Sequence, residues 1–116
     1  MRTVAAVDET RARTLGRQVA VADRWTSRLR GLLFRPRLRA GEGLLLAPCR
    51  AIHTIGMRYP IDVVYLAATG EIVRLWHEVP PGKRLPWCGA AASVLELPPG
   101  TLAEAEAGVG DLVRID

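Results

Sequence analysis

Two strand-like runs separated by a short turn constrain this chain more than any other feature of its sequence. Residues 61–67 and 71–79 flank Ala68-Thr69-Gly70, and a short glycine-containing turn between two such runs is typical of a β-hairpin. Pro80-Pro81-Gly82 follows at once. Because proline cannot donate to a strand ladder, the second strand is expected to end there. The sequence therefore predicts an antiparallel hairpin in the second half of the chain.

The remaining sequence contains further strand patterns and two helix patterns. Additional strands are expected at residues 17–22, 43–47, 92–97 and 111–115. A helix is expected near residues 24–33, where Asp23 is a suitable N-cap. A second, shorter helix is expected near residues 102–107, where Thr101 and Glu104 fit a capping box. These patterns predict a mainly β fold: a β-sandwich or a small open barrel with one or two short helices.

The strand and helix patterns define a single domain. Residues 17–116 contain no repeat, linker or low-complexity tract, so we interpret them as one β-sandwich or barrel domain. Residues 1–16 are interpreted as a mobile N-terminal extension. This N-terminus lacks a signal-like apolar stretch, and nowhere do about 18 apolar residues run uninterrupted. The sequence therefore favours a cytoplasmic protein with no membrane partner.

Arginine is concentrated in the first third of the chain. Residues 1–39 hold ten arginines and three acidic residues, a net charge of +7, whereas the remaining residues carry −3. A basic segment of this kind is found in many nucleic-acid-binding proteins. However, the arginines are not interleaved with the aromatic residues on which single-stranded nucleic acids stack. The preference for arginine also matches the Ala, Gly and Pro bias of a GC-rich genome, so nucleic acid is not the expected partner.

Several ordered sequence blocks occur together between residues 17 and 116. They are Val19–Asp23, Arg28-x-x-Gly31-Leu32-x-x-Arg35, Gly43–Leu45, Cys49-x-x-x-His53-Thr54-x-x-Met57-Arg58-x-Pro60-Ile61-Asp62, Gly70-x-Ile72-Val73, Val94–Pro98 with Gly100, and Gly108–Asp111. In this combination the chain resembles the family called domain of unknown function 192. The resemblance implies a compact β-sandwich or jelly-roll-like fold with one or two short helices. It implies no reaction, because the family has no assigned activity.

The hairpin predicts that two long loops lie close together. Residues 48–60 lead into the first strand and residues 80–90 follow the second. The first loop therefore ends, and the second loop begins, at the same end of the hairpin. Each is longer than the usual connection of about 4–6 residues, and long loops on a rigid sheet are where binding and catalytic residues concentrate. The residues predicted to bind a ligand here are His53, Thr54, Arg58, Asp62 and Trp87.

The favoured interpretation of these loops is a binding cleft for an anionic or sugar-like small molecule. Trp87 would supply an apolar platform, and Arg58, Lys83 and Arg84 would recognise the polar groups of the ligand. A purely structural role is the alternative, in which Thr54 satisfies loop backbone groups and Trp87 fills the rim of the core. The sequence indicates no oligomeric state.

Two further alternatives depend on the cysteines. A thiol-dependent enzyme would pair Cys49 or Cys88 with a histidine, His53 or His77, which Asp62 would orient. A zinc or copper site would draw on the same two cysteines and two histidines, but the closely spaced ligand pairs of such sites are missing. We therefore expect no metal and no other cofactor. In a reducing compartment we also expect no permanent disulfide.

Two carboxylates occur where the sequence predicts burial, and each needs a partner. Glu96 lies in an apolar strand, and Arg28 is the predicted partner in a structural ion pair. Asp62 begins another apolar strand, with Arg58 on the entering loop and His77 across the hairpin as its nearest candidates. A two-residue turn at Thr69-Gly70 would place Asp62 directly opposite His77.

Overall fold

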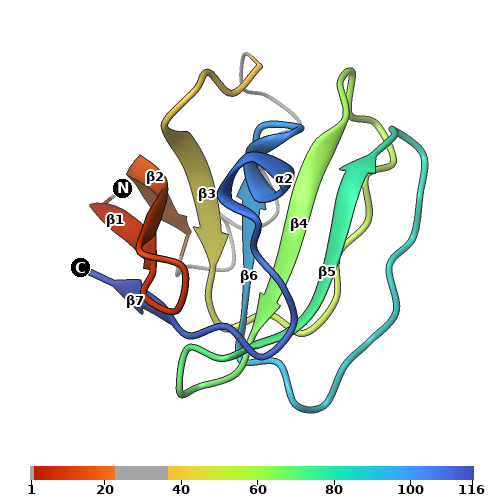
Figure 1. Ribbon diagram of the computed structural model, residues 1–116. Helices are drawn as coiled ribbons and strands as arrows, with labels where there is room; N and C mark the ends of the chain where they lie inside the picture. Colours follow the sequence, from red (N-terminus) through yellow and green to blue (C-terminus); the bar gives the residue numbers. More distant parts are fainter. Residues whose placement is uncertain (1, 23–36) are drawn as a thin grey trace.

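The computed structural model describes residues 2–22 and 37–116, and these form one seven-stranded sheet and a short helix (Figure 1). The elements are β1 (Thr3–Asp8), β2 (Arg13–Ala22), β3 (Glu42–Leu46), β4 (Ile61–Leu66), β5 (Ile72–Val79), β6 (Ser93–Leu97), α2 (Thr101–Ala105) and β7 (Val113–Ile115). The strand order is β5-β4-β6-β3-β2-β1-β7. Only the β2–β3 pair is parallel among these described strands; every other pair is antiparallel.

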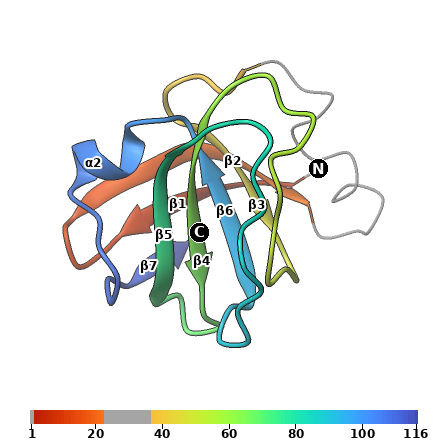
Figure 2. The same cartoon turned by 90° about the vertical axis from the view of Figure 1, so that its right-hand side faces the viewer.

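The sheet curls into an open half-barrel, so the small open barrel is the predicted fold that the structure contains (Figures 1 and 2). Its two edge strands approach each other at the hairpin turn, where Glu71 forms an isolated bridge with Leu112. The Val113 N–H also donates to the Gly70 carbonyl over 2.9 Å. Gly70 has a φ of 94°, and a Cβ atom at this position would collide with the Val113 carbonyl. Glycine is therefore required where the turn meets β7.

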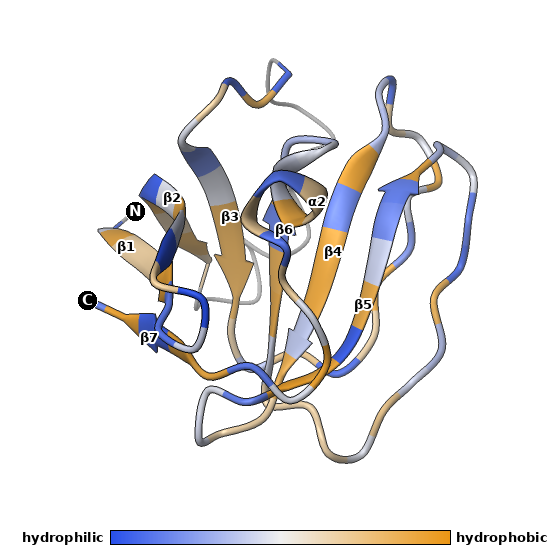
Figure 3. Ribbon diagram, in the orientation of Figure 1, coloured by the Kyte–Doolittle hydropathy of each residue, from blue (hydrophilic) through white to orange (hydrophobic). Residues whose placement is uncertain are grey.

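Two hydrophobic cores lie on opposite faces of the sheet. The inner core fills the concave face, where Leu102 and Ala105 of α2 pack among strand residues such as Val64 and Leu95. The outer core lies on the convex face, beneath non-strand segments of the chain; its members include Leu38, Leu44, Met57, Tyr59, Val63, Tyr65, Cys88, Ala91 and Val94. Because both faces are covered, β4 is buried along its whole length and its sequence is almost continuously apolar (Figure 3).

The N-terminal residues are part of the sheet rather than an extension from it. Residues 1–16 were predicted to be a mobile extension, but β1 pairs with both β2 and β7, and β2 already begins at Arg13. Val4 and Ala6 of β1 are buried in the inner core. The strand is rich in alanine, which has low β propensity, and its partner β7 is distant in sequence. Tertiary pairing therefore determines a strand that local patterns do not predict.

The short C-terminal helix is confirmed, although its predicted cap is not. α2 spans Thr101–Ala105, close to the expected 102–107. Its N-cap is Gly100 and no side chain caps it from that position; the Thr101 hydroxyl instead donates to the Pro98 carbonyl over 2.8 Å. The predicted helix at residues 24–33 lies outside the described residues.

Candidate functional site

The two long loops lie side by side, as the hairpin predicts. Cys49 and Ala92 are joined by a backbone hydrogen bond, and similar bonds join Arg50 with Cys88 and Ile52 with Leu85. His53 and Arg84 form an isolated antiparallel bridge. We call residues 49–59 and 82–92 the loop ribbon. It begins at the open end of the β4–β5 hairpin and runs beside the hairpin to the end where its turn lies. There the Ala92 N–H donates to the Leu66 carbonyl at the end of β4 (Figures 1 and 2).

Thr54 joins the two segments of the loop ribbon. Its side chain is fully buried; the hydroxyl donates to the Pro80 carbonyl over 2.7 Å and accepts from the Lys83 N–H over 2.9 Å. Its backbone N–H donates to the Lys83 carbonyl, and its carbonyl accepts from the N–H groups of Met57 and Gly82. Every polar atom of Thr54 is thus engaged by the protein itself, so this predicted ligand residue positions the site instead of facing it.

Asp62 is buried and held by backbone amides. One carboxylate oxygen accepts from the Glu78 N–H over 2.8 Å, and the other accepts from the Leu102 N–H, at the start of α2, over 2.9 Å. The central hairpin pairs have the register that a two-residue turn implies, for example Val63 with Trp76, but a β-bulge opposite Asp62 shifts the pairing at the open end. The prediction that Arg58 or His77 partners Asp62 is therefore wrong. The bulge and the helix end expose unpaired N–H groups that outcompete a side chain.

The other three predicted ligand residues are exposed. His53 projects from the loop ribbon opposite Arg84, and Arg58 lies beyond Gly56 on the same segment. The Trp87 side chain is 67% exposed, and its indole lies against Gly89. The structure thus brings His53 and Thr54 together at the open end of the hairpin, close to the segment that follows β5. Trp87 lies three residues past Arg84, toward the other end of the loop ribbon.

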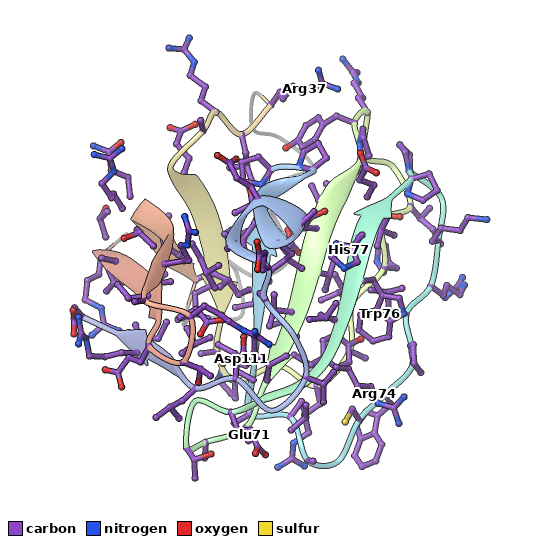
Figure 4. All side chains as sticks on the ribbon, viewed as in Figure 1. Arg37, Glu71, Arg74, Trp76, His77 and Asp111 are labelled. Atoms are coloured by element: carbon purple, nitrogen blue, oxygen red, sulfur yellow. The ribbon has the colours of Figure 1, made fainter. Side chains whose placement is uncertain are left out.

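A thiol site that sequence reasoning did not assemble lies at that other end. Cys88 is 9% exposed and packs in the outer core with Tyr65, the residue directly opposite Arg74 of β5 in the hairpin. Burial opposes ionisation of this thiol most strongly, but hydrogen bonds from Arg74 and from the N–H groups of Ala90 and Ala91 outweigh it, so the pKa of Cys88 lies below its usual value of 9.0. Figure 4 shows Arg74 on β5 near the hairpin turn. Hairpin register places Arg74 beside this loop, a signal that we had not used.

Tyr65 of β4 connects the sheet to the segment that carries Cys88. Its hydroxyl donates to the Pro86 carbonyl over 2.9 Å, and its ring meets Trp76 edge to face with centroids 4.8 Å apart. Burial chiefly raises the pKa of Tyr65, and the neighbouring charges of Cys49 and Cys88 raise it further. Both cysteines are present as thiols.

Glu96 occupies the middle of the outer face. It pairs with Leu44 and Val63 on the neighbouring strands, both members of the outer core. Burial raises the pKa of Glu96 to about 8, and its Oε2 atom has no hydrogen-bond partner among the described residues. Arg28, the predicted partner, lies outside the described residues, so the ion pair stays a prediction.

Two further buried carboxylates, Asp8 at the end of β1 and Asp111 before β7, lie near Arg11. The Arg11 Nε donates to Asp111 over 3.0 Å, and the Arg11 N–H donates to Asp8 over the same distance. Burial, followed by the neighbouring Asp111 carboxyl group, raises the pKa of Asp8. Burial opposes ionisation of Asp111 too, but its interactions with Asp8, the Arg11 guanidinium and the Gly108 N–H outweigh that effect and lower its pKa. Through Arg11 the two aspartates join the end of β1 to the segment before β7.

Within the described residues, the predicted site residues form no metal-ligand cluster and line neither of two surface hollows. Within residues 2–22 and 37–116, no three His, Cys, Asp or Glu side chains gather as a metal site, so Cys49, His53, His77 and Cys88 do not form one ligand set. A surface hollow of about 600 Å³ lies beside Gln18, Arg37 and Glu42, and another of about 330 Å³ lies between β2 and α2. None of the five predicted ligand residues lines either hollow. No described helix is long and apolar enough to cross a membrane.

The fold and the sequence blocks are those of a recognised family. Residues 5–115 match the family model of DUF192, described as an uncharacterized ACR. The chain belongs to this family. No curated protein matches it significantly.

Two solved structures share the fold of this DUF192 chain. One is a protein of unknown function from Novosphingobium aromaticivorans DSM 12444, with a TM-score of 0.81 and 23% identity over 97% of this chain and 83% of the other. The second is a Sinorhizobium meliloti 1021 protein provisionally described as a transcription regulator, with a TM-score of 0.82 and 22% identity over 97% of this chain and 91% of the other. At these identities the similarity establishes the fold alone.

Proposed function

We propose that this DUF192 protein is a small domain that binds an anionic small ligand on the exposed side of the loop ribbon, with His53 and Arg84 as its principal contacts. The observation that supports this most directly is their antiparallel bridge. Directly opposed residues of such a pair project from the same face, with Cβ atoms about 4.5–5.5 Å apart. The adjacent Ile52 and Leu85 pack against the outer core, so His53 and Arg84 face solvent together.

The charge of the loop ribbon favours an anion. Its 22 residues contain His53, Arg50, Arg58, Lys83 and Arg84 but no aspartate or glutamate. Unopposed cations in one small region raise the local potential and attract anions, most strongly at low ionic strength. A guanidinium also recognises carboxylate or phosphate with two parallel hydrogen bonds. The ligand's anionic group is therefore assigned to the His53–Arg84 pair.

Two further features suit this role. Thr54 fixes the two segments of the loop ribbon in place before any ligand arrives, which reduces the entropy lost on binding. Trp87, which is exposed on the same segment as Arg84, offers an apolar platform for a sugar-like or other non-polar part of the ligand. These features support a ligand with an anionic group joined to a ring or an apolar body.

Inorganic phosphate and a panel of sugar phosphates are suitable probes, with binding followed by nuclear magnetic resonance shifts of the Trp87 indole and the backbone amides of residues 82–88. Arg84→Ala and His53→Ala should each weaken binding at least about tenfold, roughly 1.4 kcal/mol. The matched control is Arg114→Ala, which removes an exposed arginine from β7 and should leave binding unchanged. Equal losses in Arg84→Ala and Arg114→Ala would contradict the proposal, since they would show an effect of net charge alone.

Nucleic acid fits the loop ribbon less well than a small anion. Trp87 is the one exposed aromatic residue among its 22 residues, whereas single-stranded nucleic acids are bound by successive stacking platforms. We therefore predict no affinity for RNA or DNA tighter than about micromolar at physiological salt, where non-specific binding is usually weaker than that. Fluorescence anisotropy with labelled oligonucleotides measures this directly, and a tight complex that survives at that salt concentration would contradict the prediction.

A further inference from the structure

The two cysteines lie close together at the end of the loop ribbon that is next to the hairpin turn. The Cys88 N–H donates to the carbonyl of Arg50, the residue next to Cys49, over 2.9 Å, and the Cys49 N–H donates to the Ala92 carbonyl over 3.0 Å. Both side chains contact the outer core, Cys88 as a member and Cys49 at its margin. Both sulfurs also lie near enough to the Tyr65 hydroxyl to influence its ionisation. The two thiols therefore share one site, although they are 39 residues apart in the sequence.

The surroundings of the two sulfurs differ. Arg74 is paired with Tyr65 across the hairpin, and the Tyr65 hydroxyl bonds to the carbonyl of Pro86, two residues before Cys88. Hydrogen bonds from the Arg74 guanidinium and from the N–H groups of Ala90 and Ala91 lower the pKa of Cys88. Cys49 instead donates its S–H to the Ala51 carbonyl over 3.1 Å, which requires the protonated thiol. The surroundings of Cys88 thus favour its thiolate form, whereas the S–H group of Cys49 bonds to a backbone carbonyl. Cys88 as a residue retains 9% of its surface.

We propose that Cys88 is a nucleophilic site that reacts with peroxides, and that Cys49 is its resolving thiol. In the first step the Cys88 thiolate attacks one peroxide oxygen; an S–O bond forms, the O–O bond breaks, and the released alkoxide or hydroxide takes a proton from water. In the second step the Cys49 sulfur attacks the sulfenic sulfur of Cys88. A disulfide forms, and the sulfenic oxygen leaves as water with the Cys49 proton. The two thiols lose two electrons and the peroxide gains them.

Arg74 has a positioning role in this chemistry. Its guanidinium stabilises the thiolate form of Cys88 before attack, and reaction rates of thiols depend on the fraction present as thiolate. An ordinary thiol is only a few per cent ionised at neutral pH. Removal of the guanidinium should therefore slow Cys88 at neutral pH but have a much smaller effect at alkaline pH, where every thiol is ionised.

The test uses the whole reduced protein and hydrogen peroxide. Mass spectrometry under non-reducing conditions should detect an intramolecular Cys49–Cys88 disulfide that dithiothreitol reverses. In Cys49→Ser the same treatment should instead leave a sulfenic acid at Cys88 that dimedone traps. Arg74→Gln should slow peroxide reaction at pH 7 by about tenfold or more, with the rate recovering at high pH. The matched control Arg17→Gln removes an exposed arginine from β2, away from the loop ribbon, and should leave the rate unchanged.

A second measurement on the unmodified protein covers the case of a variant that fails to fold. The pH profile of Cys88 alkylation by iodoacetamide should have a midpoint below that of Cys49. Equal midpoints, a peroxide rate unaffected by Arg74→Gln, or oxidation that yields only intermolecular disulfides would each overturn the proposal. Cys88→Ser should leave phosphate binding at the His53–Arg84 pair unchanged, so the outcome here is independent of the proposed ligand-binding function.

Discussion

The open end of the β4–β5 hairpin and the middle of the outer face each bury a carboxylate, but the two carboxylates differ in the hydrogen-bond donors around them. Asp62 and Glu96 are near neighbours, since Asp62 pairs with Leu97 and Val63 pairs with Glu96. Asp62 accepts a backbone N–H at each oxygen. Glu96 has an oxygen with no partner among the described residues, and its pKa is raised to about 8. Burial alone therefore does not determine how a carboxylate is stabilised in this sheet.

The difference arises from the availability of backbone donors. In the middle of a sheet the strand ladders use the N–H groups on both sides of β6, so none is left for the Glu96 side chain. At the open end the β-bulge at Glu78 and the first turn of α2 both leave N–H groups without ladder or helix partners. Asp62 receives one from each. Irregular backbone thus provides the anion-stabilising groups that regular strands cannot.

The largest effect is expected when Asp62 is removed. Asp62→Ala leaves the buried Leu102 N–H and the part-buried Glu78 N–H unpaired and removes a link between α2 and the hairpin, so the free energy of unfolding should fall by about 3–5 kcal/mol. Urea denaturation of the purified variant measures this. Asp116→Ala is the matched control, because it removes an exposed aspartate whose ion pair with Arg114 should contribute little. A loss below about 1 kcal/mol would mean that water replaces the carboxylate at both amides.

The effect of Glu96→Gln on the pH dependence of folding stability tests the other carboxylate. The pKa of Glu96 in the folded protein lies above its unfolded value of 4.5, so the folded state keeps a proton that the unfolded state releases. Stability from this group is complete below pH 4.5 and is lost as the pH rises toward 8, with no further change above that. At pH 7 the loss amounts to about 3 kcal/mol, and Glu96→Gln should abolish it. Denaturation curves at several pH values measure the change in slope.

The result for Glu96 also tests the predicted ion pair with Arg28. A guanidinium next to the carboxylate would keep it charged at pH 7, and Glu96→Gln would then destabilise the protein and leave Arg28 unpaired. Loss of the pH slope in Glu96→Gln would contradict the ion pair. Arg28→Ala in the unmodified background gives the complementary measurement, since it should have little effect on the slope if Glu96 is protonated.

Thr54→Val should have an intermediate effect. The two side chains have nearly the same shape, but valine leaves the Pro80 carbonyl and the Lys83 N–H without their buried partner. We expect a loss of about 2 kcal/mol in unfolding free energy, with faster hydrogen exchange at the amides of Lys83 and Leu85. Thr101→Val is the control, because the Thr101 hydroxyl makes one bond to Pro98 near the surface. Equal losses in the two variants would argue against Thr54 as the residue that joins the loop ribbon.

Much of the fold was predictable because local patterns determine it. The hairpin and the adjacency of the two loops follow from the turn signal at residues 68–70, whereas the central register also depends on a shift between Tyr65 and Leu66. The partners of Asp62 were not predictable, because they depend on a bulge at Glu78, a non-glycine residue with a φ of 49°, which no turn motif marks. The Arg74–Cys88 contact was missed for a different reason. It joins a strand residue to a loop residue, and the predicted site took only Asp62 and His77 from the strands.

The smallest effect on stability is expected at Trp87, and it separates binding from folding. Trp87 is 67% exposed, so Trp87→Ala should change the unfolding free energy by no more than about 0.5 kcal/mol while it weakens binding of sugar phosphates. Trp76 provides a control of the same residue type. It is half-buried and packs edge to face on Tyr65, so Trp76→Ala should cost about 2 kcal/mol. If Trp87→Ala proves as destabilising as Trp76→Ala, the indole belongs to the rim of the core, and the loop ribbon offers its anion no apolar platform.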